Sequence, residues 1–181
     1  MLHFKKNEIE IERPKKEDIT SIEALFVTVL KDNWEKNGLW DLQEDLEDEI
    51  RVKKEFIAMD FATNGKDKYF LIAKVAGHVV GTIEIGEANE TIKACGDELL
   101  CSLPEIGTVF VLPEYQGSGI GSKMIEEMVQ YLKNESYKGF CIDSGYKTAQ
   151  VIWIHKYGEP TFTLKDHWGP ELDHMVWQVL F

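Results

Sequence analysis

Short runs of apolar and β-branched residues, each bounded by turn residues, predict six strands along this chain. The second and third runs flank Ala76-Gly77-His78, a pattern typical of a hairpin. Residues 86–102 are polar and irregular, and they predict a loop before the fourth strand. The predicted strands cover residues 7–12, 69–75, 79–85, 106–112, 140–143 and 172–180.

Apolar residues at helical spacing predict four helices between these strands. Asp18 is expected to cap the first helix, and Gly38 is expected to end it. The second helix, near residues 39–57, has a densely acidic outer side, which is either a solvated helix face or an acidic wall that attracts an amine. The third helix follows a glycine-rich turn, and the fourth spans residues 149–155.

The resulting order of elements is β-α-α-β-β-β-α-β-α-β, which predicts an α/β fold. Residues 1–181 contain no linker, internal repeat or low-complexity run. A chain of 181 residues is also long enough to bury a sizeable core in one domain. We therefore expect a single domain over residues 1–181.

The most informative stretch joins the fourth predicted strand to the third predicted helix. Pro113 has no N–H to donate and should end the strand. Gly117, Gly119 and Gly121 allow a tight turn whose amides point outward. A helix that opens from such a turn presents unpaired N–H groups and the positive end of its dipole, which is a typical site for a phosphate or pyrophosphate. Glycine spacing alone fits a turn without a ligand equally well, and it excludes both the G-x-x-x-x-G-K-[ST] and the G-x-G-x-x-G loops.

Composition narrows the class of partner. The net charge of −12 argues against nucleic acid, whose phosphates such a surface repels, and is compatible with a cationic amine. The three cysteines and five histidines show no metal-ligand spacing, which predicts reduced thiols and no bound metal. The charged N-terminal segment resembles no signal peptide, and no apolar run is long enough to span a membrane. We therefore expect a cytoplasmic protein without membrane contact.

The string Val111-x-Pro113-x-Tyr115-Gln116-Gly117-x-Gly119-Ile120-Gly121 resembles the acetyl-CoA signature of the GNAT family of N-acetyltransferases. The core of that signature, Gln/Arg-x-x-Gly-x-Gly/Ala, is matched in register by residues 116–121. Residues 11–19 also resemble the opening of the family's domain. The resemblance implies a mixed, strongly twisted central sheet flanked by helices, and an acyltransferase with acetyl-CoA as its co-substrate.

The resemblance also implies which residues hold acetyl-CoA. In the family, the pyrophosphate lies on amides of the glycine turn, and the pantetheine arm pairs with an edge of the central strand that a bulge exposes. A backbone N–H of Phe110 or Val111 would face the thioester carbonyl. The implied binding residues are Val109, Phe110, Val111, Gln116, Gly117, Ser118, Gly119, Ile120, Gly121 and Ser122.

Acetyl transfer to an amine needs a proton acceptor, because only the neutral amine attacks. Glu105 maps onto a glutamate that is the general base in some relatives, and Glu84 on the preceding strand is a second candidate; both also fit ordinary strand carboxylates. The family's proton donor is a tyrosine, but that position here falls on Ile154, or on Trp153 after a shift of one residue. Tyr157 is the nearby candidate for this role.

The function implied is the transfer of acetyl from acetyl-CoA to a primary amine of a small molecule or peptide, by direct attack in a ternary complex. Cys141, on a buried strand, is expected to be an inert thiol, so no covalent enzyme intermediate is required. A homodimer is compatible with this function. The missing tyrosine leaves open a sensor or interaction module that binds coenzyme A with weak or no catalysis, and a nucleotide-binding fold of another class is a third hypothesis.

Overall fold

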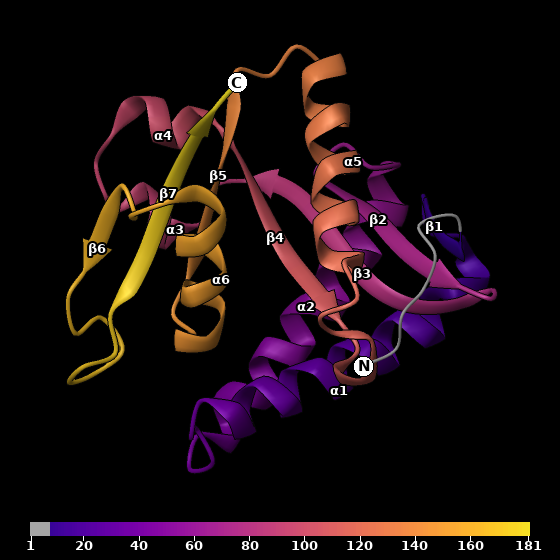
Figure 1. The fold of residues 1–181 in the computed structure, drawn as a ribbon, viewed down its shortest axis with the longest axis horizontal. Helices are drawn as coiled ribbons and strands as arrows, with labels where there is room; N and C mark the ends of the chain where they lie inside the picture. The colour runs from indigo at the N-terminus through magenta and orange to yellow at the C-terminus, as the bar shows by residue number, and fades with distance from the viewer. Residues whose placement is uncertain (1–7) are drawn as a thin grey trace. The chain divides into compact units, whose positions relative to one another are not determined.

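The computed structural model describes residues 8–181. Its strands are β1 (Ile9–Glu12), β2 (Lys68–Val75), β3 (His78–Glu87), β4 (Pro104–Val111), β5 (Gly139–Ser144), β6 (Phe162–Leu164) and β7 (His174–Leu180). Its α-helices are α1 (Ile19–Lys36), α2 (Gln43–Thr63), α3 (Glu90–Lys93), α4 (Glu98–Ser102), α5 (Ile120–Asn134) and α6 (Lys147–Tyr157). Asn7, where the first strand is expected to begin, lies outside the described residues. Figure 1 shows these elements as a ribbon.

The strands are hydrogen-bonded in the order β1-β2-β3-β4-β5-β7-β6. β1 pairs antiparallel with β2, and β7 pairs antiparallel with both β5 and β6. β4 and β5 are parallel, with Glu105 opposite Cys141. The expected α/β fold with a mixed sheet and flanking helices is confirmed.

The chain divides into two compact units. The first unit holds the residues up to Ile85 together with Thr108–Tyr131, and the second holds Gly86–Gly107 and Leu132–Phe181. Strands β3 and β4 each contribute residues to both units. The expectation of one domain over residues 1–181 stays a prediction.

In the first unit, helices cover both faces of the strands. Phe26 of α1 packs its ring against Phe70 and Phe110, with centroid distances of 6.3 and 6.1 Å. Tyr69, the neighbour of Phe70 in β2, stacks on Tyr131 of α5 at 4.0 Å. Successive side chains of a strand point to opposite faces, so α1 and α5 lie on opposite sides of β2.

Arg13 and the buried Asp60 form an ion pair that links α2 to β2 in the same unit, because both side chains also bond the backbone of Phe70. Arg13 donates from Nη1 to Asp60 Oδ2 at 2.6 Å and from Nη2 to the other carboxylate oxygen. Asp60 is fully buried and also accepts from the backbone N–H of Phe70 at 2.6 Å. Such a two-pronged pair is among the strongest that side chains form, because both partners are oriented as well as attracted. Figure 1 shows α2 running beside α1, and the two helices are in contact.

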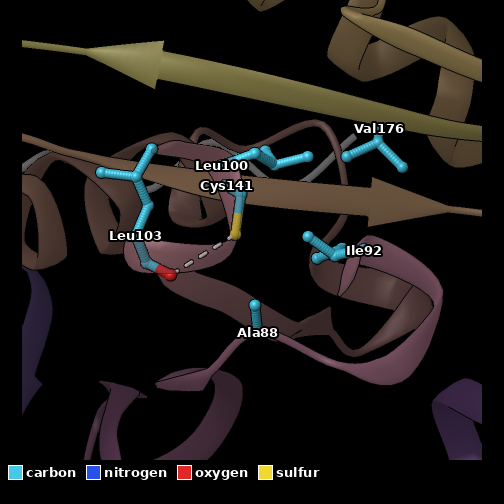
Figure 2. Close-up of a cluster of buried hydrophobic side chains, with 6 residues drawn as sticks. All are labelled: Ala88, Ile92, Leu100, Leu103, Cys141 and Val176. Atoms are coloured by element: carbon cyan, nitrogen blue, oxygen red, sulfur yellow. Dashed lines mark hydrogen bonds between the residues drawn. The ribbon is translucent and has the colours of Figure 1, made fainter. Parts of the chain in front are cut away.

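In the second unit, β5 carries apolar side chains to both of its faces. Cys141 lies in a cluster of buried apolar residues from α3, α4, β7 and the adjoining loops, which Figure 2 shows as sticks. Its neighbour Phe140 instead meets the ring of Tyr157 from α6 at 5.7 Å, edge to face. The cluster around Cys141 contains Ala88, Ile92, Leu100, Leu103 and Val176.

The second unit differs in two places from the elements expected from the sequence. Residues 86–102 are not a plain loop, because they contain α3 and α4. Asn89 and Asp97 cap these helices by accepting from Ile92 N at 2.9 Å and Leu100 N at 2.7 Å. The two helices have four and five residues, too few to show a helical period in the sequence. The three-residue strand β6, paired with β7, was likewise not predicted.

The expected role of Asp18 is also wrong. Asp18 stands immediately before α1, but its carboxylate makes no hydrogen bond to the amides of that helix. It accepts instead from the backbone N–H of Lys15 at 2.9 Å and pairs with Lys74 Nζ at 2.8 Å. The buried ammonium of Lys74 competes successfully for this carboxylate. Gly38, with φ of +70°, follows the end of α1 as expected.

Candidate functional site

The glycine turn follows β4 directly in the first unit. A short 3-10 helix, Pro113–Tyr115, ends the strand as Pro113 predicts. Gly117 and Gly119 then adopt φ values of +72° and +88°, which glycine reaches without strain. The backbone N–H of Lys123 donates to Gly119 O at 3.0 Å, which closes the first turn of α5.

This turn leaves room for a ligand at the N-terminus of α5. A Cβ placed on Gly119 would meet no atom within 4 Å, so the space over this residue is open. Gly117, Gly119 and Ser122 are exposed, whereas Ile120 and Met124 are buried and anchor the helix. The amides of the first turn have no acceptor within the helix, and the dipole of this 15-residue helix is positive here. The geometry therefore fits an anionic group.

The side chain of Gln116 holds the turn in place. Its Nε2 donates to the carbonyl of Val111 at the end of β4, at 3.0 Å. Its Oε1 accepts from Lys36 Nζ of α1 at 3.2 Å. Ser118 Oγ donates to the carbonyl of Tyr115, which closes the turn from within. These contacts fix the turn to β4 and α1, and the Lys36 ammonium is itself paired with Asp32 of α1.

The last part of β4 departs from a regular strand at Thr108. This residue has φ of +49°, and its carbonyl accepts from Thr82 Oγ1 at 3.0 Å. A left-handed residue inside a strand is the backbone signature of a bulge, which turns the strand away from a neighbour. Val109 and Val111 are half-buried beyond it, and Phe110 is buried against α1.

Glu84 lies in the first unit and is 1% exposed. Its Oε2 is 3.1 Å from Lys68 Nζ, and its Oε1 accepts from Thr108 Oγ1 at 3.3 Å. The Lys68 ammonium also lies 4.1 Å from the centre of the Phe56 ring. This carboxylate is already neutralised by a buried cation of the chain itself.

Glu105 lies in the second unit and is 9% exposed. Its carboxylate accepts two hydrogen bonds from Asn89, one from the backbone N–H at 2.8 Å and one from Nδ2 at 3.2 Å. The same Nδ2 donates to Asp143 Oδ2 at 2.8 Å, and Asp143 is bonded to His174 Nε2 at 2.9 Å. Glu105 is therefore held by amide donors, with a second carboxylate on the far side of the same amide.

The sequence did not single out Asn89, Asp143 or His174. The only local signal is the position of Asn89 before Glu90-Thr91-Ile92, which is typical of a helix cap. The bonds from Asn89 reach Glu105 and Asp143, 16 and 54 residues away. No local pattern contains such contacts.

Tyr157 and Cys141, also in the second unit, are both held in apolar surroundings. Tyr157 packs between Phe140 and Trp153, with centroid distances of 5.7 and 6.1 Å. Burial raises the pKa of the Tyr157 phenol to about 12. Burial, together with the charges of Glu105 and Asp143, raises the pKa of the Cys141 thiol to about 12. Both groups stay protonated at neutral pH.

Part of the acidic outer side of α2 is paired with basic residues of the same helix. Arg51 bonds Asp48 and Glu55 at 2.9 Å each, and Lys53 lies 3.1 Å from Glu49. These pairs at helical spacing neutralise part of the acidic row within the helix itself.

Residues 8–181 contain neither a metal-binding cluster of acidic, His and Cys side chains nor a membrane-spanning helix. No group of three or more His, Cys, Asp and Glu side chains in this range is arranged to hold a metal ion. No helix in this range is both long and apolar enough to cross a membrane.

Comparisons with known proteins place these features in a wider context. A model of the acetyltransferase (GNAT) family matches residues 20–150. A comparison with curated proteins finds no match. Among solved structures, the PaiA N-acetyltransferase from Thermoplasma acidophilum in complex with coenzyme A has a TM-score of 0.67 at 18% identity, covering 94% of this chain and 98% of that chain.

Two other solved structures share the fold. The ribosomal-protein-alanine N-acetyltransferase from Brucella melitensis has a TM-score of 0.67 at 19% identity, covering 95% of this chain and 99% of that chain. A chimera of the spermidine N-acetyltransferase SpeG from Vibrio cholerae and hSSAT has a TM-score of 0.63 at 13% identity, covering 96% and 95%. At these identities the likeness concerns the fold.

The family match covers well over half of the chain. It includes β4, the glycine turn and α5, where the sequence signature lies. The chain therefore belongs to the acetyltransferase (GNAT) family.

Proposed function

We propose that this protein transfers the acetyl group of acetyl-CoA to a primary amine by direct attack. The observation that carries the proposal is the open glycine turn at the N-terminus of α5, where exposed amides and the helix dipole suit a pyrophosphate. Hydrogen bonds from Gln116 to Val111 of β4 and from Lys36 of α1 to Gln116 hold this turn in place. Family membership and the complex of a fold relative with coenzyme A favour acetyl-CoA over other nucleotides.

Acetyl-CoA supplies an acyl group activated as a thioester. Residues 116–122 would hold its pyrophosphate, and residues 109–111 would pair with its pantetheine arm beyond the bulge at Thr108. A backbone N–H of Phe110 or Val111 would donate to the carbonyl oxygen as it gains negative charge. Holding both reactants in place supplies much of the rate, because orientation alone contributes about 7–11 kcal/mol.

We assign the role of proton acceptor to Glu105. Its carboxylate accepts hydrogen bonds from the backbone N–H and the side-chain amide of Asn89, which fix its orientation. Glu84 is the weaker candidate, because Lys68 already neutralises it. A base of this kind acts on the acceptor ammonium directly or through a water molecule.

No dedicated proton donor is required in this proposal. A thiol has a pKa of about 8.5, so the leaving thiolate is stable enough to depart unassisted. Tyr157, with its pKa raised to about 12, is a poor acid for such a leaving group. The proposal specifies the acceptor only as a primary amine. The fold relatives include an enzyme named for the alanine of a ribosomal protein and one named for spermidine.

The proposal is tested with the wild-type chain and the Glu105→Gln variant. Calorimetry with acetyl-CoA measures binding, and release of free thiol in the presence of a panel of primary amines measures transfer. We expect both proteins to bind acetyl-CoA equally, and the variant to turn over about 100-fold more slowly at neutral pH. Binding of acetyl-CoA without turnover of any amine would instead favour the sensor module, and absence of binding would overturn the proposal.

A further inference from the structure

The side-chain amide of Asn89 uses all of its hydrogen-bonding groups within the second unit. Its Oδ1 accepts from Ile92 N at 2.9 Å, and this contact distinguishes the oxygen of the amide from its nitrogen. Its Nδ2 then directs one hydrogen to Glu105 Oε1 at 3.2 Å and the other to Asp143 Oδ2 at 2.8 Å. One amide therefore orients two carboxylates.

A hydrogen bond from Trp168 fixes the tautomer of His174, the residue that bonds Asp143. Trp168 Nε1 can only donate, and it does so to His174 Nδ1 at 2.9 Å. Nδ1 is therefore without a proton, and Nε2 carries the hydrogen that Asp143 Oδ2 accepts at 2.9 Å. Gly145 allows this contact, because a Cβ at that position would lie 2.7 Å from Trp168 Nε1.

We propose that Asn89 is a positioning residue that fixes the Glu105 carboxylate for proton abstraction, and that Asp143, His174 and Trp168 hold Asn89 in turn. This inference rests on the proposed function of Glu105. An amide does not transfer a proton between its partners. These hydrogen-bonded side chains therefore act on Glu105 by orientation and charge, and not as a proton relay.

A purely structural role does not account for this arrangement. The neighbouring residues of α3, α4 and β7 form an apolar cluster around Cys141 (Figure 2). Placing two carboxylates and an imidazole at the border of such a cluster costs free energy that apolar side chains of similar size would not. His174 and Asp143 keep side-chain exposures of only 7% and 14%. The cost in stability is accounted for if these polar side chains orient the Glu105 carboxylate for reaction.

The Asn89→Asp variant isolates the proposed role. Aspartate keeps the acceptor that caps α3, so the helix is retained, but it loses both Nδ2 hydrogens and brings a third carboxylate beside Glu105. We expect kcat at pH 7 to fall about tenfold, the acid limb of the pH–rate profile to move to higher pH by about one unit, and the KM for acetyl-CoA to stay unchanged. Asp97→Asn, at the cap of α4, is the matched control and should leave the profile unchanged.

The same substitution is then placed in the Glu105→Gln background. If Asn89 acts through Glu105, Asn89→Asp causes no further loss there. An equal loss in both backgrounds, with no movement of the acid limb, would overturn the role of Asn89 while leaving Glu105 as the base. Wild-type rates for Glu105→Gln alone would overturn the base, and the role of Asn89 with it.

Trp168→Phe gives a second test that does not depend on the stability of the core. Trp168 is 59% exposed, and phenylalanine removes the donor while keeping an aromatic ring beside His174. We expect a smaller fall in kcat in the same direction. In the wild type, nitrogen-15 spectra of His174 should show a proton on Nε2 and none on Nδ1, and a proton on Nδ1 would contradict these contacts.

Discussion

Lys68 Nζ lies 3.1 Å from Glu84 Oε2 in the interior of the first unit, with side-chain exposures of 11% and 2%. The carboxylate of Glu105 is held by the amide groups of Asn89. The two candidate bases therefore lie in different surroundings: an ion pair with Lys68 at Glu84, and hydrogen bonds from an amide at Glu105. Glu84 completes a buried ion pair, and removing its charge leaves an ammonium without a partner.

The first prediction concerns this ion pair. Glu84→Gln is expected to lower the free energy of unfolding by about 3–5 kcal/mol, because one buried partner is lost and the other remains. Denaturant unfolding measures the loss. Glu55→Gln is the matched control, since its pair with Arg51 is exposed and should contribute less than about 1 kcal/mol. A folded Glu84→Gln protein with wild-type stability and no turnover would instead make Glu84 the base.

The second prediction concerns Tyr157. Its phenol is packed between aromatic rings, and burial raises its pKa to about 12. Tyr157→Phe keeps this packing and removes only the hydroxyl, so we expect kcat to be nearly unchanged. A tyrosine that protonated the leaving thiolate would cost about 100-fold when removed. Steady-state rates with saturating acetyl-CoA distinguish the two results.

The third prediction concerns the glycine turn. Gly119 and Gly77 have φ values of +88° and +79°, and neither would place a Cβ within 4 Å of another atom. Alanine at either position costs about 1–2 kcal/mol of backbone strain. Only Gly119→Ala puts a methyl group over the amides proposed to hold the pyrophosphate, so we expect the Kd for coenzyme A to rise about tenfold or more for this variant alone. Equal affinities in calorimetry would contradict the assignment of the turn.

The sequence predicted the glycine turn because every signal for it is local. Pro113 ends the strand, Gly117 and Gly119 supply the positive φ values, and the apolar period of α5 follows at once. The hairpin between β2 and β3 was predictable for the same reason, since Ala76 and Gly77 both adopt positive φ there. Backbone conformation and burial at these positions depend on neighbours a few residues away.

The surroundings of Glu105 could not be predicted in this way. They depend on a helix cap in residues 86–102 meeting β4 and β5, and that segment has too few residues per helix to show a period. Asp18 failed as a predicted cap for a related reason. A lysine 56 residues further along the chain, Lys74, pairs with its carboxylate. Long-range ion pairs override local preference without a trace in the local sequence.

The fourth prediction concerns Cys141. With its pKa raised to about 12 by burial, only about 10⁻⁴ of this thiol is ionised at pH 8. We expect a thiol reagent to leave Cys141 unmodified in the folded protein and to modify it after denaturation. Cys141→Ala should also retain turnover, because direct attack by the amine uses no enzyme thiol. Loss of turnover in a folded Cys141→Ala protein would point to a covalent acetyl intermediate.

The last prediction concerns the pH range in which Lys74 stabilises the first unit. Burial alone would raise the pKa of Asp18, but hydrogen bonds from Lys74 and the Lys15 backbone outweigh it and hold the pKa below its usual value. Hydrogen bonds to Asp18 and Glu12 raise the pKa of Lys74. The contribution of Asp18 is therefore lost as pH falls below about 4, and that of Lys74 as pH rises above about 10.4.

Lys74→Met tests this window directly. The variant leaves Asp18 buried without its cation, so we expect a loss of about 3–5 kcal/mol at neutral pH. Because protonation of Asp18 or deprotonation of Lys74 removes the same pair in the wild type, the difference between the two proteins should shrink below about pH 4 and above about pH 10.4. Lys54→Met, which breaks the exposed pair with Glu23, should change stability by less than about 1 kcal/mol at any pH. A loss that is constant from pH 3 to pH 11 would mean that Lys74 contributes through the packing of its aliphatic stem and not through its charge.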